Sequence, residues 1–295
     1  MIFARRISER RRFRAARNSG LTLVELMVTL VILAGLLTAA SVSTATFRER
    51  HRAEKTASIG RAIVDALNRV DGLSFVSDMG RLPASADELK YLFAQDNGLA
   101  ALPAYSQHAL AFSGLPIADS HVTNNFAMPT LGAGWRGPYC DTAAAALGAD
   151  GALLDGFGGE WSFDGEILVS FGRDQSPDFD DAAASWQDSD QVFSLRPARL
   201  TSEVELTVNV SCVSSNAVRE LHAYYFEPAF SGGCVSRHFS VTNSASLSIS
   251  GGLSVGKRAL FVYAKDSGGA AFADAPRLIH LRPGNNAEAF TLFKK

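Results

Sequence analysis

The chain has 295 residues, 47% of them hydrophobic and 20% charged, a balance that is typical of a folded protein and excludes an intrinsically disordered one. The formal net charge of -2 hides an asymmetry, because the first 20 residues carry seven arginines and one acidic residue, whereas residues 21–295 carry 21 basic and 29 acidic residues. A protein this acidic after residue 20 repels phosphates in most orientations, so we expect no nucleic-acid binding.

An uncharged apolar stretch, residues 26–47, follows the basic leader. At about 1.5 Å per residue it would extend roughly 33 Å as a helix, enough to cross the hydrocarbon core of a bilayer. The arginines before it predict a cytoplasmic N-terminus, with the bulk of the protein on the periplasmic side of a bacterial inner membrane. An ordinary secretory signal fits less well, because the apolar stretch is too long and offers only a weak cleavage site near Ala39 and Ala45.

Apolar residues continue at helical spacing beyond the uncharged stretch. The pattern is carried by Ala53, Ala57, Ile63, Ala66, Leu67 and Val70. It predicts one long helix over residues 21–73, apolar in its first half and amphipathic in its second. We expect the second half to pack its apolar stripe on a globular head.

A lone acidic residue, Glu25, lies at the start of the apolar stretch, where a carboxylate is costly in lipid and usually has a partner. The run Gly20-Leu21-Thr22-Leu23-Val24-Glu25-Leu26 resembles the cleavage and methylation motif of type IV prepilins and type II secretion pseudopilins. The resemblance implies that a prepilin peptidase cuts after Gly20 and that the new Leu21 amine is N-methylated. It also implies that the Glu25 carboxylate meets the Leu21 amine of a neighbouring subunit during filament assembly. The alternative is that Glu25 only marks the helix start, where an acid suits the helix dipole.

Four short motifs in residues 74–195 resemble, in the same order, the major pseudopilin of type II secretion. They are residues 78–83, 134–139, 155–161 and 167–174. The resemblance covers roughly residues 20–190 and implies a small antiparallel sheet packed on the long helix. We interpret the aromatic residues of these motifs as core residues rather than a ligand-binding set: Trp135, Tyr139, Phe157 and Trp161.

An acidic loop closes this region, with six aspartates between residues 174 and 190. Such carboxylates repel one another unless solvent or a cation intervenes, and oxygen ligands suit a hard cation such as calcium. The pseudopilin resemblance implies a structural calcium ion. It assigns the carboxylates of Asp174 and Asp181 and the backbone carbonyls of Phe171 and Ser185 as ligands, and Asp178 or Asp180 could replace either carboxylate. A solvated acidic loop without metal is the alternative.

Residues 196–295 change to a period of two, which is clearest where Val204, Leu206, Val208 and Val210 alternate with polar residues. Glycine-rich turns separate seven strand-like runs, over residues 204–210, 221–226, 238–242, 245–249, 259–264, 278–281 and 287–293. This pattern predicts an antiparallel β-sandwich. Ordinary major pseudopilins lack such a module, so we expect an appended domain that presents a binding surface, or one that only stabilises the subunit.

The three cysteines form no C-x-x-C pair, which argues against a structural zinc site. Cys212 and Cys234 could form a disulfide in an oxidising compartment or stay as two buried thiols, and Cys140 would pack as a small hydrophobic residue. The six histidines show no H-x-H or H-E-x-x-H spacing, and no nucleophile or phosphate-loop motif is present. We therefore predict no enzymatic activity.

The predicted fold is α+β. A leader (1–20) precedes the long helix (21–73), a pilin-like head (74–195) and a β-sandwich (196–295). The predicted function is that of a structural subunit of a type II secretion pseudopilus or a related type IV filament, anchored in the inner membrane before assembly. Its partners would be homologous subunits, the prepilin peptidase and the inner-membrane assembly platform. The alternative is a minor type IV pilin whose β-domain is an adhesin or other ligand-binding module.

Overall fold

The computed structural model describes residues 22–95, 100–111, 126–140, 147–148, 151–177, 190–213 and 216–294. The chain divides into two compact units, one up to Glu49 and one from Arg50 onward. Four of the predicted site residues lie outside the described residues: Gly20, Leu21, Asp181 and Ser185.

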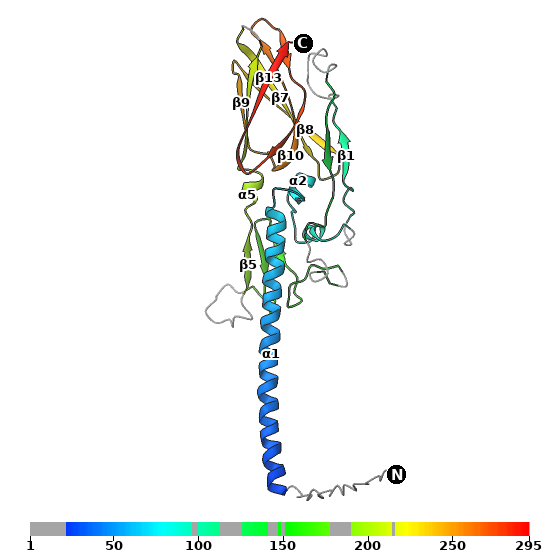
Figure 1. Ribbon diagram of the computed structural model, residues 1–295, viewed down its shortest axis with the longest axis vertical. Helices are drawn as coiled ribbons and strands as arrows, with labels where there is room; N and C mark the ends of the chain where they lie inside the picture. Colours follow the sequence, from blue (N-terminus) through cyan, green and yellow to red (C-terminus); the bar gives the residue numbers. More distant parts are fainter. Residues whose placement is uncertain are drawn as a thin grey trace, which may run out of the picture. The chain divides into compact units, whose positions relative to one another are not determined.

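The predicted long helix is present as α1 (Leu23–Asn68), drawn in blue in Figure 1. In its first half the apolar side chains are exposed, and threonine hydroxyls donate to carbonyls one turn back, as Thr38 does to Ala34 (2.8 Å) and Thr44 to Ala40 (2.7 Å). These bonds satisfy the hydroxyls within the helix itself, which a helix in lipid requires.

The second half of α1 buries one face in the second unit. Ile59, Ile63 and Leu67 recur every four residues and are almost fully buried, as the predicted amphipathic pattern requires. They join a core cluster that also contains Phe75 and Trp161. The helical face therefore organises the head around it.

The head consists of short elements, as expected for a small antiparallel sheet region. They are α2 (Phe75–Met79), the 3-10 helix η1 (Glu88–Leu92), the pair β1 (Ser106–Ala109) and β2 (Thr130–Ala133), and the sheet β3 (Ser162–Phe163), β4 (Ile167–Ser170) and β5 (Gln191–Ser194). Both sheets are antiparallel.

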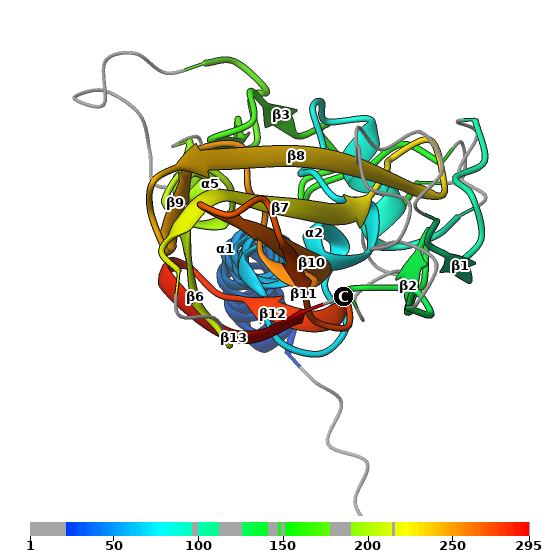
Figure 2. The same cartoon turned by 90° about the horizontal axis from the view of Figure 1, so that it is seen from above.

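The C-terminal region begins with the short helix α5 (Pro197–Leu200) and continues as one eight-stranded sheet. The strands are β6 (Val204–Cys212), β7 (Val218–Pro228), β8 (Cys234–Thr242), β9 (Ser246–Ser250), β10 (Gly256–Asp266), β11 (Ala271–Ala273), β12 (Arg277–Leu281) and β13 (Gly284–Lys294). Their order is β8-β7-β10-β11-β13-β6-β9, with β12 also paired to β10. Viewed from above, the strands curve into a barrel-like arrangement (Figure 2).

All seven predicted strands are present, and the α+β class is confirmed. Three features differ from the expectation. A sandwich has two separate sheets, whereas these eight strands form one barrel-like sheet, because β11 pairs with β13 and so joins its two halves. The strand β11 was not predicted, because three residues are too few to show a period of two. The pair β6 and β13 is parallel, whereas the other pairs in the sheet are antiparallel.

The central strands β7 and β10 are buried on both faces. Leu221, Leu260 and Val262 point into the barrel-like core, whereas Tyr224 and Phe261 point to a second cluster that Leu110 and Leu131 of the head complete. This double burial explains why the two strands read as nearly continuous apolar runs in the sequence.

The short helix α2 is buried along its whole length and belongs to both cores. Val76 packs into the β-rich core, whereas Phe75 and Met79 pack into the head core. The cysteines form no disulfide: Cys140 is buried, and Cys212 on β6 and Cys234 on β8 are half-buried thiols.

Candidate functional site

The described part of the protein begins at the junction on which the processing and assembly predictions depend. The Glu25 backbone N–H donates to the Thr22 hydroxyl (3.3 Å), and the Leu26 N–H donates to the Thr22 carbonyl (3.0 Å). Thr22 therefore caps α1, and a glutamate three residues after a threonine cap is the spacing of a capping box. Glu25 is exposed in the first turn of α1, where its negative charge interacts favourably with the positive end of the helix dipole.

The helix after this junction is the described segment that is long and apolar enough to cross a membrane. Its apolar window is wholly exposed within its own unit, with residues such as Leu30, Leu33 and Leu37 more than half exposed. An apolar surface of this size needs lipid or neighbouring helices to cover it.

The described part of the predicted calcium loop begins directly after β4. Phe171 is half-buried, and the exposed Asp174 accepts a hydrogen bond from the Ser176 N–H through Oδ1 (3.2 Å). The other two predicted ligands, Asp181 and Ser185, lie outside the described residues. Within the described residues, no group of three or more His, Cys, Asp or Glu side chains is placed to hold a metal. Calcium binding therefore stays a prediction.

The turn that begins at Asp155 braces the start of this loop. The buried Asp155 carboxylate accepts the N–H groups of Phe157 and Gly159 through Oδ1 (2.8 Å each) and the hydroxyl of Ser170, at the end of β4, through Oδ2. The Gly156 N–H donates to the Thr56 hydroxyl of α1 (2.9 Å). A Cβ at Gly156 would lie 2.1 Å from the backbone oxygen of Arg52, so only glycine lets the turn approach the helix. The turn thus ties β4 to α1.

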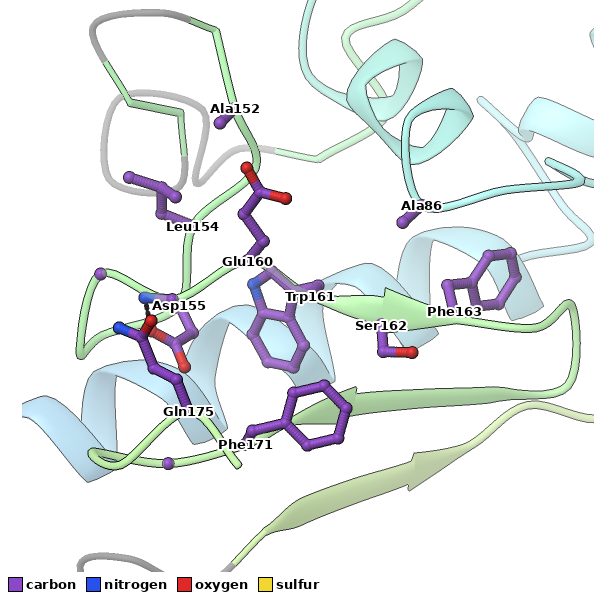
Figure 3. A pocket seen from close by; sticks show the side chains of 13 residues that line it. Ala86, Ala152, Leu154, Asp155, Glu160, Trp161, Ser162, Phe163, Phe171 and Gln175 are labelled. Carbon is purple, nitrogen blue, oxygen red and sulfur yellow. Dashed lines mark hydrogen bonds between the residues drawn. The ribbon is translucent and has the colours of Figure 1, made fainter. Parts of the chain in front are cut away.

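A cavity of about 840 Å³ lies beside this turn, and Asp155, Glu160, Trp161, Phe171 and Gln175 surround it (Figure 3). Trp161 is buried against Phe193, with ring centroids 5.9 Å apart. Its indole N–H has no hydrogen-bond partner within the described residues. The Glu160 carboxylate lines the cavity, but among the residues that the structure describes there is no group of three metal-ligating side chains.

The predicted core aromatics behave mainly as the sequence indicates. The Trp135 indole N–H donates to the Tyr91 carbonyl (2.7 Å), and Trp135 packs edge-on against Tyr139. Tyr139 and Trp161 are buried, whereas Phe157 is only half-buried.

An ion pair that the sequence analysis did not assign links two of the quoted motifs. Arg136 donates to both carboxylate oxygens of Asp78 (3.0 and 2.9 Å), and the Tyr139 hydroxyl donates to Asp78 Oδ2 (3.2 Å). Burial raises the pKa of Asp78, and the Arg136 guanidinium opposes that rise. Burial also raises the pKa of the Tyr139 hydroxyl. Asp78 and Arg136 are 58 positions apart in the sequence, and no local pattern indicates that they form a contact.

Comparison with known proteins gives one match that bears on function. The family model of the prokaryotic N-terminal methylation motif matches residues 15–41. No curated protein matches the sequence. A crystal structure of a DUF4876 family protein from Bacteroides thetaiotaomicron VPI-5482 aligns with 31% of this chain and 23% of its own, at 11% identity and a TM-score of 0.23, which is too low to carry an argument.

The matched motif is a prepilin signal of the type IV pilin kind, and it includes Glu25 and the start of α1. The motif implies a type IV pilin-like precursor that prepilin peptidase processes and that assembles with other pilin subunits. The apolar helix and the motif fit single-pass anchoring in the inner membrane. Such a protein is structural rather than catalytic in character.

Proposed function

We propose that the protein is a structural subunit of a type II secretion pseudopilus or a related type IV filament. The observation that carries the proposal is the methylation motif over residues 15–41, which runs directly into a 46-residue helix with an exposed apolar first half. Cleavage after Gly20 would leave Leu21 as the N-terminal residue and Glu25 as the fifth. The exposed apolar half of α1 would be held in the membrane and then pack among the same helices of other subunits.

The β-rich region favours a second candidate, a minor pilin that carries a ligand-binding module. The eight-stranded sheet is larger than both head sheets together. The helix α2 belongs to the cores of both the head and this sheet. A subunit that is anchored in a filament by α1 would therefore hold the sheet in a fixed position on its head. A rigidly held module is suited to presenting a surface outside the filament. Genes for a secretin or for pilus components beside this one would separate the two candidates.

The assembly role of Glu25 is tested by Glu25→Ala in cells that carry the matching assembly system. An ion pair at about 4 Å and an effective dielectric constant of about 20 is worth up to roughly 4 kcal/mol, so the filament yield should fall by about tenfold or more. Membrane insertion should not change, because the substitution makes the helix more apolar. Sheared filaments and membrane fractions are compared by immunoblot.

Glu54→Ala serves as the control, because Glu54 lies on the same helix and pairs with its neighbour Arg50 at the surface. Mass spectrometry of the mature N-terminus should find methylated Leu21 in both variants. Normal filament yield from Glu25→Ala would contradict the assembly role and leave the helix-cap role of Glu25 standing.

We also propose a structural calcium ion in the loop that follows β4. Its support is the density of aspartates between residues 174 and 190 and the bracing of the loop start by Asp155. A ligand at about 100 times its dissociation constant stabilises by about 2.7 kcal/mol, so a chelator should lower the melting temperature of the full-length protein in detergent by about 5–10 °C.

The variant Asp174→Ala should remove most of this response to the chelator. Asp65→Ala, which changes an exposed aspartate on α1, should respond as the unmodified protein does. Equal melting temperatures with and without chelator would contradict the calcium proposal. They would not bear on the proposed pilin-like function.

A further inference from the structure

A second cavity, of about 350 Å³, lies where the end of the head meets the β-rich sheet. It is lined by residues from α2, β10, β12 and the segments beside β1 and β2, among them Leu73, Asp78, Tyr105, Arg136, Lys257 and His280. No motif in the sequence marks it as a site.

Two of the basic residues are placed together by strand register. Lys257 on β10 is the direct partner of His280 on β12, so both side chains leave the same face of the sheet. Residues in this relation have Cβ atoms roughly 5 Å apart, so a single bound group at this point of the cavity can reach both side chains.

The acids at the cavity already have partners. The Asp78 carboxylate accepts both donors of Arg136, and Arg136 also covers the ring of Tyr105, 4.9 Å from its centroid. Asp71 precedes the lining residue Gly72 in the sequence and lies 3.2 Å from the His280 imidazole and 4.0 Å from Arg282. The Lys257 ammonium makes no hydrogen bond or ion pair within the described residues.

The charge balance indicates what the cavity accepts. Among the side chains that line the cavity, the charges of Arg136 and Lys257 are opposed by that of Asp78 alone, which leaves a net charge of +1 when histidine is counted as neutral. Residues 21–295 as a whole are strongly acidic, with 29 acidic against 21 basic residues, so a positive cavity stands out from the rest of the surface. A ligand with one negative charge would neutralise the cavity, whereas a phosphate dianion would leave it with a net negative charge.

We propose that this cavity binds a single carboxylate of a partner protein, from an acidic side chain or from the partner's C-terminus, with Lys257 as the principal contact. The exposed Leu73 and the Tyr105 ring supply apolar surface for the residue that carries the carboxylate. The cavity is then a recognition point at the boundary between head and sheet. The inference does not depend on the filament type.

Four short peptides with an uncharged fluorophore on the N-terminus test the proposal by fluorescence anisotropy, with the full-length protein in detergent. One has a single glutamate and an amidated C-terminus, one has a neutral sequence and a free C-terminus, one is neutral and amidated, and one has a single phosphoserine and is amidated. At least one of the two carboxylate peptides should bind about tenfold more tightly than the neutral amidated one. Which of them does so identifies the source of the carboxylate.

The variant Lys257→Gln should abolish this preference, and Lys257→Arg should keep most of it, since Lys257 is exposed and neither change disturbs a core. Lys294→Gln removes the same charge from β13, away from the cavity, and should leave binding unchanged. Equal binding of the carboxylate peptides and the neutral amidated one, or a preference that survives Lys257→Gln, would overturn the proposal. Tighter binding of the phosphoserine peptide than of both carboxylate peptides would overturn the assignment to a single negative charge.

Discussion

Gly80 shows how a single residue joins the head to the β-rich sheet. It ends α2 with a positive φ of 77°, and its N–H donates to the Val76 carbonyl (2.9 Å). A Cβ at this position would lie 2.1 Å from the carbonyl oxygen of Pro228, at the end of β7. Glycine is therefore required twice, once for the backbone conformation and once for the close approach.

Comparison of Gly80→Ala with Gly251→Ala separates these two requirements. Gly251 has the same φ of 77°, and a Cβ there would meet nothing within 4 Å. Both variants should lose about 1 kcal/mol for the left-handed conformation, and Gly80→Ala should lose about 1–3 kcal/mol more because of the overlap. Urea unfolding followed by tryptophan fluorescence measures the difference. Equal losses of unfolding free energy in the two variants would show that α2 and β7 can move apart at little energetic cost.

At the scale of elements, four rings form a ladder across β7, β8 and β10. The His222 ring stacks on those of Tyr263 and His238, with centroids 4.5 and 5.3 Å apart, and His238 stacks on Tyr224 at 4.6 Å. His222 Nδ1 lies 3.1 Å from His238 Nε2, so only one of the two nitrogens can carry a proton between them. Cross-strand aromatic pairs of this kind stabilise the sheet when the imidazoles are neutral.

This ladder should make the stability of the fold depend on pH. Burial lowers the pKa of both His222 and His238; Glu220 beside His222 opposes the shift, and Lys265 and the neighbouring imidazole add to it. A folded-state pKa below the ordinary value of about 6.5 means that the contribution is complete above that pH and is lost as the pH falls below it.

The free energy of unfolding should therefore fall between pH 7.5 and pH 5.5. The double variant His222→Gln/His238→Gln should flatten this pH dependence, whereas His51→Gln, an exposed position on α1, should not. Denaturant unfolding at each pH gives the comparison. An unchanged slope in the double variant would assign the pH dependence to other groups.

At the scale of the whole molecule, residues 50–295 form one compact unit because buried polar contacts join its parts. Arg258 on β10 is fully buried and donates to the carbonyl of Ser77 in α2 (3.1 Å) and to the hydroxyl of Tyr225 (3.0 Å). Through Ser254 it connects to the buried Glu227, which in turn pairs with Arg237. Such a network is costly to break, because each partner left behind is desolvated.

The variant Arg258→Gln should therefore destabilise the unit by about 3 kcal/mol or more. Arg282→Gln, which alters an arginine side chain that is 70% exposed, should change stability by less than about 0.5 kcal/mol. The midpoint of denaturant unfolding of the full-length protein reports both. A small effect of Arg258→Gln would show that the apolar contacts between head and sheet are sufficient to hold them together.

The amino-acid sequence by itself determined the features that depend on local pattern. The leader charge, the uncharged stretch and Glu25 defined the prepilin-like start, since each is a short-range property of the sequence. The helical period of Ile63 and Leu67 and the alternation from Val204 to Val210 predicted α1 and β6 for the same reason.

The tertiary structure alone decided which distant residues meet. It brought Asp78 to Arg136, Ser77 to Arg258 and Lys257 to His280, and it set β13 parallel to β6. No local pattern encodes these contacts, because they depend on strand register and on the burial of α2 between two cores. The prepilin-like start could thus be predicted from its local sequence. The cavity beside Lys257 could not, because its lining residues come together only in the folded protein.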